Sequence, residues 1–375
     1  MRGGTSRAIF FREEDLAKYD ATARDRIVLA AMGSPDPHGR QVDGLGGGIS
    51  SLSKVAIVGR EDGSRGGVTF NFGQVEVDRA AIDWSGTCGN ISAAVGPYAI
   101  DERLCPAEEP VTLVLVRSWN TGKRFIAHVP VRGGMAETEG GYVIDGVPDS
   151  GAKVTLEFLE PGASLGRGVL PTGAPVQDVQ MPGHKAVRAS IVDAVIPMVF
   201  VRAADMKSDA TKPAAELDKD VRLKNLLEAV RCQAAVLLGL AKTAAEAHER
   251  SKAVPKVAMV TPASSYAASG TRYVQAREVD LVARAVSMGA THRTFPASAT
   301  MCAAVAASIE GTIVQEAAGH PSGGRLRIGH PAGVIEASAK VERRGGEWLV
   351  PSITTYRTAR RIMEGYVVVP EQRLK

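Results

Sequence analysis

The alternation of apolar and polar positions predicts short strands interrupted by a few helices. Residues 53–58, a short apolar run that begins with Ser53 and Lys54, predict a strand with Lys54 on the same face as Ala56 and Val58. Residues 91–98 carry apolar side chains at i, i+3, i+4 and i+7, which predicts a helix with Cys88 at its N-terminal end. Further strands flank that helix, so the first half of the chain is predicted to be an antiparallel α+β unit.

The second half of the chain repeats this plan. A strand at 256–260 leads to a second helix start built from small residues within 292–305. This repetition predicts two related domains, residues 1–183 and 184–375, with the last strand able to return to the first domain. Four more elements are predicted outside the repeated segments. They are helices at 13–32, 223–237 and 278–288 and a strand at 311–316.

Composition and charge exclude several classes of protein. The chain has 375 residues, of which 45% are hydrophobic, and a formal charge of only +4. The basic residues are scattered, which argues against binding of nucleic acid or of an anionic membrane. The longest apolar run, 194–201, is far too short to span a bilayer. The four cysteines lack the spacing of a disulfide framework or a zinc site, so we expect a cytoplasmic protein without a metal.

Three features could carry chemistry. A thiol at the start of a helix, as predicted for Cys88, meets unpaired backbone N–H groups that favour thiolate and can hold a carboxylate. Lys54 could carry a proton at the mouth of a buried strand face. The glycine-rich run 44–51 resembles an anion nest, although it has neither a Walker loop nor a dinucleotide fingerprint. Each feature also has a structural interpretation: a space-filling cysteine, a snorkelling lysine and a plain turn.

Five motifs in the same order resemble the 2-methylaconitate cis-trans isomerase (PrpF) family, which includes 4-oxalomesaconate tautomerases and methylitaconate Δ-isomerases. The resemblance implies a diaminopimelate epimerase-like α+β fold, with two similar domains that each wrap an antiparallel sheet around a central helix and hold the active site between them. It also implies isomerisation by 1,3-allylic proton transfer in an unsaturated di- or tricarboxylic acid, without a cofactor. The motifs are MRGGTS, GGGISSLSKVAIV, CGNISAAVGPYAI, RIGHPAG and RTARRIMEGYVVVP.

Two residues match the acid/base residues of that family, Lys54 and Cys88. Moving a double bond along an allyl unit passes through a dienolate-like anion, so a base, an acid and preorganised donors are needed. The remaining candidates are expected to bind the substrate, and a structural or surface role stays open for Arg293 and His330. They are Arg2, Gly3, Thr5, Ser6, Gly48, Ser50, Ser51, Gly89, Asn90, Ser264, Ser265, Arg293, Thr300, Met301 and His330.

Two features depart from the family pattern. Members usually carry a further short strand before MRGGTS, and Arg7 stands where they have a lysine. Compared with diaminopimelate epimerases, the second catalytic cysteine is replaced by Ala297 or Ser298, which disfavours a two-thiol racemase. Two alternatives remain, an amino-acid racemase or epimerase and a non-catalytic carboxylate-binding partner of a metabolic enzyme. The sequence leaves open the substrate, the residue that acts first as base, and whether the chain forms a homo-oligomer.

Overall fold

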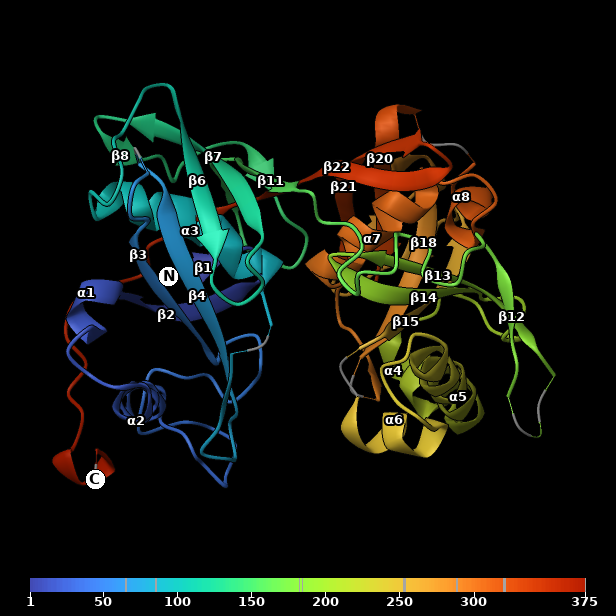
Figure 1. Cartoon of the computed structure of the whole chain (residues 1–375), viewed down its shortest axis with the longest axis horizontal. Helices are drawn as coiled ribbons and strands as arrows, with labels where there is room; N and C mark the ends of the chain where they lie inside the picture. Colours follow the sequence, from blue (N-terminus) through green and yellow to red (C-terminus); the bar gives the residue numbers. More distant parts are fainter. Residues whose placement is uncertain are drawn as a thin grey trace. The chain divides into compact units, whose positions relative to one another are not determined.

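The computed structural model describes residues 1–64, 66–84, 86–181, 183, 185–251, 254–287, 289–319 and 322–374. Contacts divide the chain into two units (Figure 1). Unit 1 comprises Met1–Leu159 and Tyr356–Lys375, and unit 2 comprises Glu160–Thr355. Each unit is a mixed α/β body with a central helix, so the expected fold class is confirmed. The domain boundary expected at residue 183 stays a prediction.

The central helix of unit 1 is α3 (Gly89–Asp101), and ten of its thirteen residues are buried. It packs against strands from both ends of the chain, among them β1, β7, β8 and β23 (Figure 1). Small side chains make this close packing possible. At Gly96, for example, a Cβ atom would lie only 2.7 Å from Val129 Cγ2 of β7. The position of α3, and therefore of its first residues, is fixed by the core.

The strands around α3 are mostly antiparallel, with parallel pairing between β2 and β3 and between β4 and β6. The other elements of unit 1 have the following bounds: β1 Arg2–Gly3, β2 Ser6–Arg12, α1 Glu13–Leu16, α2 Ala21–Met32, β3 Lys54–Arg60, β4 Val68–Val75, β5 Ile82–Asp83, β6 Val111–Ser118, β7 Arg124–Arg132, β8 Met135–Ala136, β9 Tyr142–Val143, β10 Ser150–Gly151, β11 Val154–Leu159, β23 Ala359–Arg360 and η3 Glu371–Arg373.

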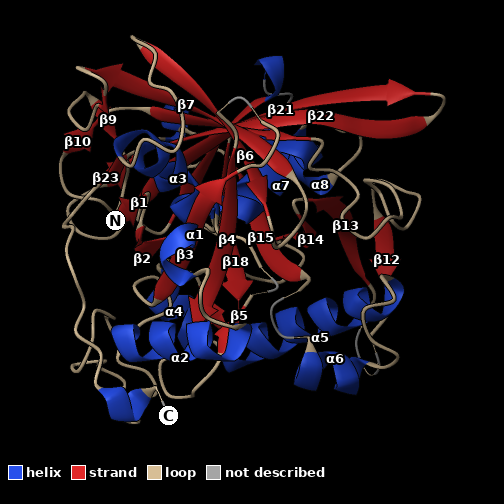
Figure 2. Cartoon of the chain, turned by 60° about the vertical axis from the view of Figure 1, so that its left-hand side comes forward, coloured by secondary structure: helices blue, strands red, loops and turns tan. Residues whose placement is uncertain are grey.

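A second layer of unit 1 is formed by α2, which lies outside the strands (Figure 2). Its residues Val28 and Met32 pack with Val55, Ile57 and Val75 from β3 and β4. Strand β3 is therefore buried on both of its faces, which explains why 55–58 form a continuous apolar run.

Unit 2 is built on the same plan around α7 (Ala297–Ala307), which packs against β13, β14, β20 and β21. A separate core joins α5 to the strands, and α6 packs on α5 (Figure 2). The elements of unit 2 have the following bounds: β12 Gln177–Val179, β13 Val187–Ala194, β14 Ile196–Arg202, α4 Ala214–Lys219, α5 Val221–Leu237, α6 Ala244–Arg250, β15 Lys256–Pro262, β16 Tyr266–Ala267, β17 Tyr273–Val274, η1 Ala276–Glu278, β18 Leu281–Ser287, β19 Ala290–Thr291, α8 Ile313–Ala318, η2 Ser322–Gly324, β20 Arg325–His330, β21 Gly333–Arg344 and β22 Glu347–Arg357, whose last two residues belong to unit 1.

Two predicted elements are wrong. The helix predicted at 278–288 is the strand β18, in which residues 281–286 are all buried because the strand lies between β15 and β20 in the sheet; Met288 itself lies outside the described residues. The strand predicted at 311–316 is the helix α8, because the Thr312 hydroxyl caps it by accepting from Gln315 N–H at 3.1 Å. The helix predicted at 13–32 is divided between α1 and α2.

Within the described part of the chain, we find no helix with the length and apolar character needed to cross a membrane.

Candidate active site

The N-terminal loop and the first turn of α3 are joined by Asn90. The Asn90 Nδ2 donates to Thr5 Oγ1 at 3.0 Å and, more weakly, to Ser6 Oγ at 3.5 Å. Gly3 is needed for this approach, because a Cβ atom there would lie 2.4 Å from the Asn90 carbonyl oxygen. The structure therefore brings together Gly3, Thr5, Ser6 and Asn90, four of the residues expected to bind a substrate.

Cys88 is the N-cap residue of α3, as the sequence predicts. Its backbone is extended (φ −129°, ψ 105°), and its side chain makes no capping hydrogen bond to the helix. Its carbonyl oxygen accepts from both the N–H and the hydroxyl of Ser92, each at 2.9 Å. The thiol is half-buried and not in a disulfide. It therefore lies beside the first N–H groups of the helix, including those of Gly89 and Asn90, where an anion is favoured.

Lys54 is the first residue of β3, and its side chain is buried. Its Nζ donates to Gln74 Oε1 on the neighbouring strand β4 and lies 5.4 Å from the centre of the Phe72 ring. Gln74 is held in turn, because its Nε2 donates to the carbonyl oxygens of Ser50 and Ser53 at 3.1 and 3.0 Å. Gln74 was not identified from the sequence. The signal that could have found it is its position opposite Lys54 in the β3–β4 pair.

The glycine-rich segment is organised by Gln41, a buried residue with φ of +53°. Its Oε1 accepts from Gly48 N–H at 2.9 Å and from the Ser53 hydroxyl at 2.6 Å. The Gly48 N–H is therefore already used within the protein. Ser50 is exposed and Ser51 is half-buried, and their carbonyl oxygens accept from Gln74 and from the N–H of Arg7 respectively.

Asn120 holds the segment that leads to Cys88. Its Nδ2 donates to the carbonyl oxygens of Phe72 at 2.8 Å and Trp84 at 2.6 Å, and its Oδ1 accepts from Phe72 N–H at 2.8 Å. One side chain thereby ties β4, next to Lys54, to the residues before α3. The local sequence does not predict this role of Asn120, because Phe72 and Trp84 are both distant from it in the chain.

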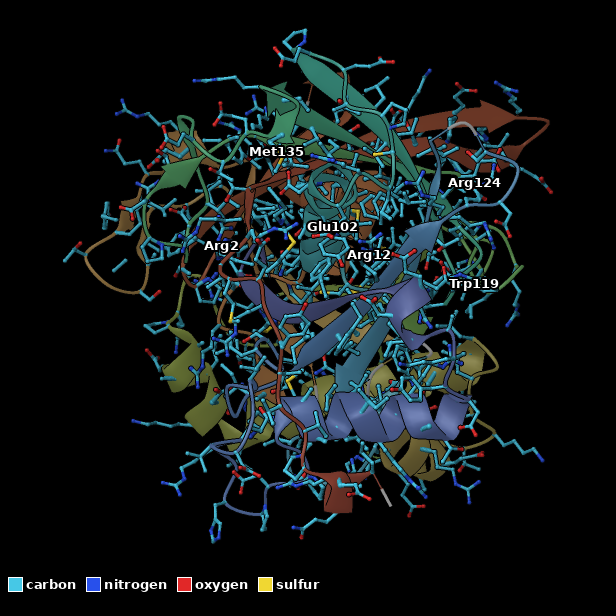
Figure 3. The ribbon with its side chains drawn as sticks, turned by 90° about the vertical axis from the view of Figure 1, so that its left-hand side faces the viewer. Arg2, Arg12, Glu102, Trp119, Arg124 and Met135 are labelled. Atoms are coloured by element: carbon cyan, nitrogen blue, oxygen red, sulfur yellow. The ribbon has the colours of Figure 1, made fainter. Side chains whose placement is uncertain are left out.

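Two arginines lie beside the N-terminal loop. Arg2 Nη1 donates to the carbonyl oxygens of Gly4 at 3.1 Å and Thr358 at 3.0 Å, and burial lowers the pKa of Arg2 (Figure 3). Arg357 is buried, and its Nε donates to Asn90 Oδ1 at 3.0 Å. Arg357 lies within the last of the five sequence motifs, yet the sequence alone gave it no role.

Four candidate residues of unit 2 already have polar partners within that unit. The Ser264 hydroxyl donates to the Pro262 carbonyl at 3.0 Å, and Ser265 Oγ accepts from Ala276 N–H at 2.9 Å. Arg293 is exposed and lies 3.4 Å from Asp218. His330 is buried at the end of β20, where its Nδ1 accepts from Ala332 N–H at 3.1 Å.

Thr300 and Met301 are both buried inside α7, which begins at Ala297. The Thr300 N–H already donates to the Pro296 carbonyl at 2.9 Å. The first turn of this helix therefore offers the N–H groups of Ala297, Ser298 and Ala299 in place of those expected at Thr300 and Met301. The helix therefore begins earlier than expected, with Pro296 as its N-cap residue.

A pocket of about 640 Å³ borders β2 and residues 361–367 in unit 1, but its lining includes neither Lys54 nor Cys88. Its charges are largely paired: Glu102 accepts from Arg361 at 2.8 Å and lies 3.8 Å from Arg12 (Figure 3). These groups lie at the C-terminal end of α3, opposite to Cys88. The pocket is therefore separate from the candidate catalytic residues.

One cluster among the described residues has the side chains of a metal site, namely Glu228, Cys232 and His248. Its centre is occupied by Arg231, which donates to Glu228 Oε1 at 2.7 Å and to Cys232 Sγ at 3.2 Å. A divalent cation would meet this guanidinium at close range. We interpret the cluster as an ion-pair network that fastens α6 to α5.

Comparisons with known proteins extend over the whole chain. The profile of a family described as PrpF protein matches residues 1–370. A 2-methyl-aconitate isomerase of Cupriavidus necator is 40% identical, over 99% of this chain and 96% of its own length. A 3-methylitaconate isomerase of Eubacterium barkeri is also 40% identical, over 100% and 97% of the two chains. A (4E)-oxalomesaconate Delta-isomerase of a Novosphingobium species (strain KA1) is 34% identical, over 98% and 96%. The crystal structure of a methylitaconate-delta-isomerase superposes with a TM-score of 0.87 at 39% identity, covering 100% of this chain and 95% of that one.

Proposed function

Because this chain belongs to the PrpF protein family, we propose that it isomerises an unsaturated di- or tricarboxylic acid by 1,3-allylic proton transfer. The resemblance seen in the five motifs is confirmed, and the chain is an isomerase. Its relatives are named for 2-methylaconitate, 3-methylitaconate and oxalomesaconate, which are all unsaturated polycarboxylates. We infer that a compound of this type is the substrate and that the enzyme works in the cytoplasm.

The observation that carries the proposal is the position of Cys88 at the N-terminus of α3. In our mechanism Cys88 and Lys54 are the acid/base pair. One of them removes a proton from the allylic carbon, and the electrons move into a dienolate-like anion. The other returns a proton to the carbon two positions away, so the double bond shifts and nothing is oxidised or reduced. The chemistry consists of two proton transfers, and we infer that no cofactor is required.

The substrate carboxylates need hydrogen-bond donors close to the reacting carbons. We propose that the N–H groups of Gly89 and Asn90 supply some of these, since they lie in the first turn of α3. Arg2, Thr5 and Ser6 add charge and hydroxyl groups from the N-terminal loop. Buried surroundings strengthen each of these interactions, because the local dielectric constant is lower than in water.

Lys54 is suited to the acid/base role because its position is fixed. Gln74 accepts from its Nζ, and the Phe72 ring lies 5.4 Å away, so the side chain has little freedom to leave the site. A positioned amine can exchange a proton with a substrate carbon without a further loss of side-chain conformational entropy during the reaction.

Proton NMR in deuterated buffer tests the proposal, with 2-methylaconitate, 3-methylitaconate and oxalomesaconate as substrates. We expect the wild-type protein to isomerise at least one of them and to introduce deuterium at the allylic carbon. Cys88→Ser and Lys54→Met should each lose at least about a hundredfold in kcat, the range usual for removal of a general acid or base. Cys105→Ser and Lys256→Met are the matched controls, because Cys105 is a buried cysteine of unit 1 and Lys256, like Lys54, opens a strand.

Two results would contradict the proposal. If Cys88→Ser and Lys54→Met both keep full turnover, the acid/base assignment is wrong. If the wild-type protein exchanges the α-proton of an amino acid and leaves every unsaturated acid unchanged, the enzyme is a racemase or epimerase. Thermal stabilisation by these acids without any deuterium incorporation would instead indicate a protein that only binds carboxylates.

A further inference from the structure

We propose that Arg357 is a positioning residue for Cys88: its guanidinium fixes Asn90 in the first turn of α3, the helix whose N-cap residue is Cys88. This inference rests on the proposed function, in which Cys88 takes part in proton transfer. Arg357 is the last residue of β22, and it is far from Cys88 in sequence.

The guanidinium of Arg357 is held in one place. Its side chain is buried, its Nε donates to Asn90 Oδ1 at 3.0 Å, and its Nη1 donates to the Tyr356 carbonyl at 2.6 Å. Gly4 allows this arrangement: a Cβ atom there would lie 3.0 Å from Arg357 Cδ and 2.4 Å from Asn90 Oδ1. Arg357 is therefore enclosed between the N-terminal loop and α3.

The hydrogen bond to Asn90 also orients the carboxamide of that residue. Because Oδ1 accepts from Arg357, Nδ2 points toward the N-terminal loop and donates to Thr5 Oγ1 at 3.0 Å. Without the arginine, the carboxamide could rotate and this contact would be lost. Arg357 thus links the turn that carries Cys88 to the loop expected to bind a carboxylate.

Charge provides the second part of the argument. Burial lowers the pKa of Arg357 to about 10, while its electrostatic interactions with Tyr142 and Cys88 act in the opposite direction. The guanidinium remains charged at neutral pH, so its hydrogen bond to Asn90 Oδ1 is charge-assisted and holds the carboxamide more firmly than a neutral donor would. Two other cations lie nearby: Arg2 donates to the Thr358 carbonyl, and Lys153 lies over the ring of Tyr142 at 5.2 Å. Neither of these is enclosed as Arg357 is by Gly4 and Asn90.

Alkylation of Cys88 and steady-state kinetics together test the inference. Iodoacetamide reacts with thiolate, and mass spectrometry of the peptide that contains Cys88 gives the rate for that residue alone at a fixed pH. Arg357→Met should change this rate and lower kcat about tenfold, because the first turn of α3 is no longer joined to the N-terminal loop. Arg357→Lys keeps the charge but cannot reproduce the guanidinium geometry. Its kcat should therefore also fall about tenfold.

The matched control is Arg361→Met. Arg361 lies in the same segment, but it pairs with Asp101 and Glu102 at the other end of α3, about 20 Å along the helix from Cys88. Removing this charge should leave the alkylation rate and kcat unchanged. A change as large as that of Arg357→Met would mean that net charge, and not the position of Arg357, determines the reactivity.

The inference is overturned if folded Arg357→Met protein keeps the wild-type alkylation rate and the wild-type kcat. Should that variant fail to fold, Arg357→Lys decides, because wild-type kcat in the lysine variant would exclude a positioning role. The proposed function fails separately, since a wild-type protein that isomerises no unsaturated acid refutes it whatever the alkylation rates show.

Discussion

Replacing Gln74 by leucine should impair catalysis more than folding. Leucine removes the oxygen that accepts from Lys54 Nζ and the amide that donates to the carbonyl oxygens of Ser50 and Ser53. A hydrogen bond to a charged group contributes about 1.5–3 kcal/mol. If all of it is lost in the transition state, kcat falls by a factor of about 10–150. The two amide hydrogen bonds contribute about 0.5–1.5 kcal/mol each to stability, and burial of leucine offsets part of their loss.

The assay measures kcat and KM for the isomerised acid by NMR, together with urea unfolding of both proteins. We expect a loss in kcat, a smaller change in KM, and a decrease of about 1–2 kcal/mol in the free energy of unfolding. Gln177→Leu is the matched control, because Gln177 is also a strand glutamine and its Oε1 accepts from Thr172 at 2.6 Å. Wild-type kcat in Gln74→Leu would refute the idea that Gln74 positions Lys54. A kcat loss of similar size in Gln177→Leu would mean that the effect is not specific to the site.

Three further predictions concern stability and its connection to the site. Burial acts to raise the pKa of Glu228, but hydrogen bonds from Arg231 and His248 outweigh it and lower the pKa from 4.5 to about 2. Glu228→Gln should therefore lower the free energy of unfolding by up to about 3 kcal/mol near pH 7, as measured by urea unfolding. The difference in stability between the variant and the wild-type protein should shrink as pH falls from 4.5 toward 2. Gly96→Ala should lower the free energy of unfolding by about 1–3 kcal/mol in the same assay, because overpacking against β7 outweighs the gain in helix propensity; equal or greater stability would contradict this. Asn120→Ala should lower both Tm and kcat, by removing about 1–3 kcal/mol of hydrogen bonding, and an unchanged kcat would show that the segment before Cys88 needs no such support.

The sequence predicted the parts of the site that depend on local structure. Cys88 was placed at the start of a helix because small and apolar residues follow it with helical spacing, and α3 begins at the next residue. Lys54 was placed on a strand because the apolar residues after it form a short run. In both cases the decisive interactions are between neighbours in the chain. The resemblance to a known family then added the expected chemistry.

The parts that the sequence missed depend on pairing between distant residues. Gln74 meets Lys54 only because β3 and β4 pair in one register, and Arg357 meets Asn90 across most of the chain length. The error at 278–288 has the same origin, since a strand buried between two others has no alternation to distinguish it from a helix. A local pattern identifies which side chains can react, whereas sheet register determines which side chains hold them.

The rigidity of α3 connects these two kinds of information. Most of the helix is buried, so it cannot shift along its axis without repacking the core of unit 1. Cys88 and the N–H groups of Gly89 and Asn90 are fixed to that helix, and their positions therefore follow from packing far from the reacting atoms. Substitutions in the middle of α3, such as Gly96→Ala, should accordingly change kcat as well as stability. A variant that loses stability but keeps wild-type kcat would show that the first turn of α3 is positioned by Arg357 and the N-terminal loop instead of by the core.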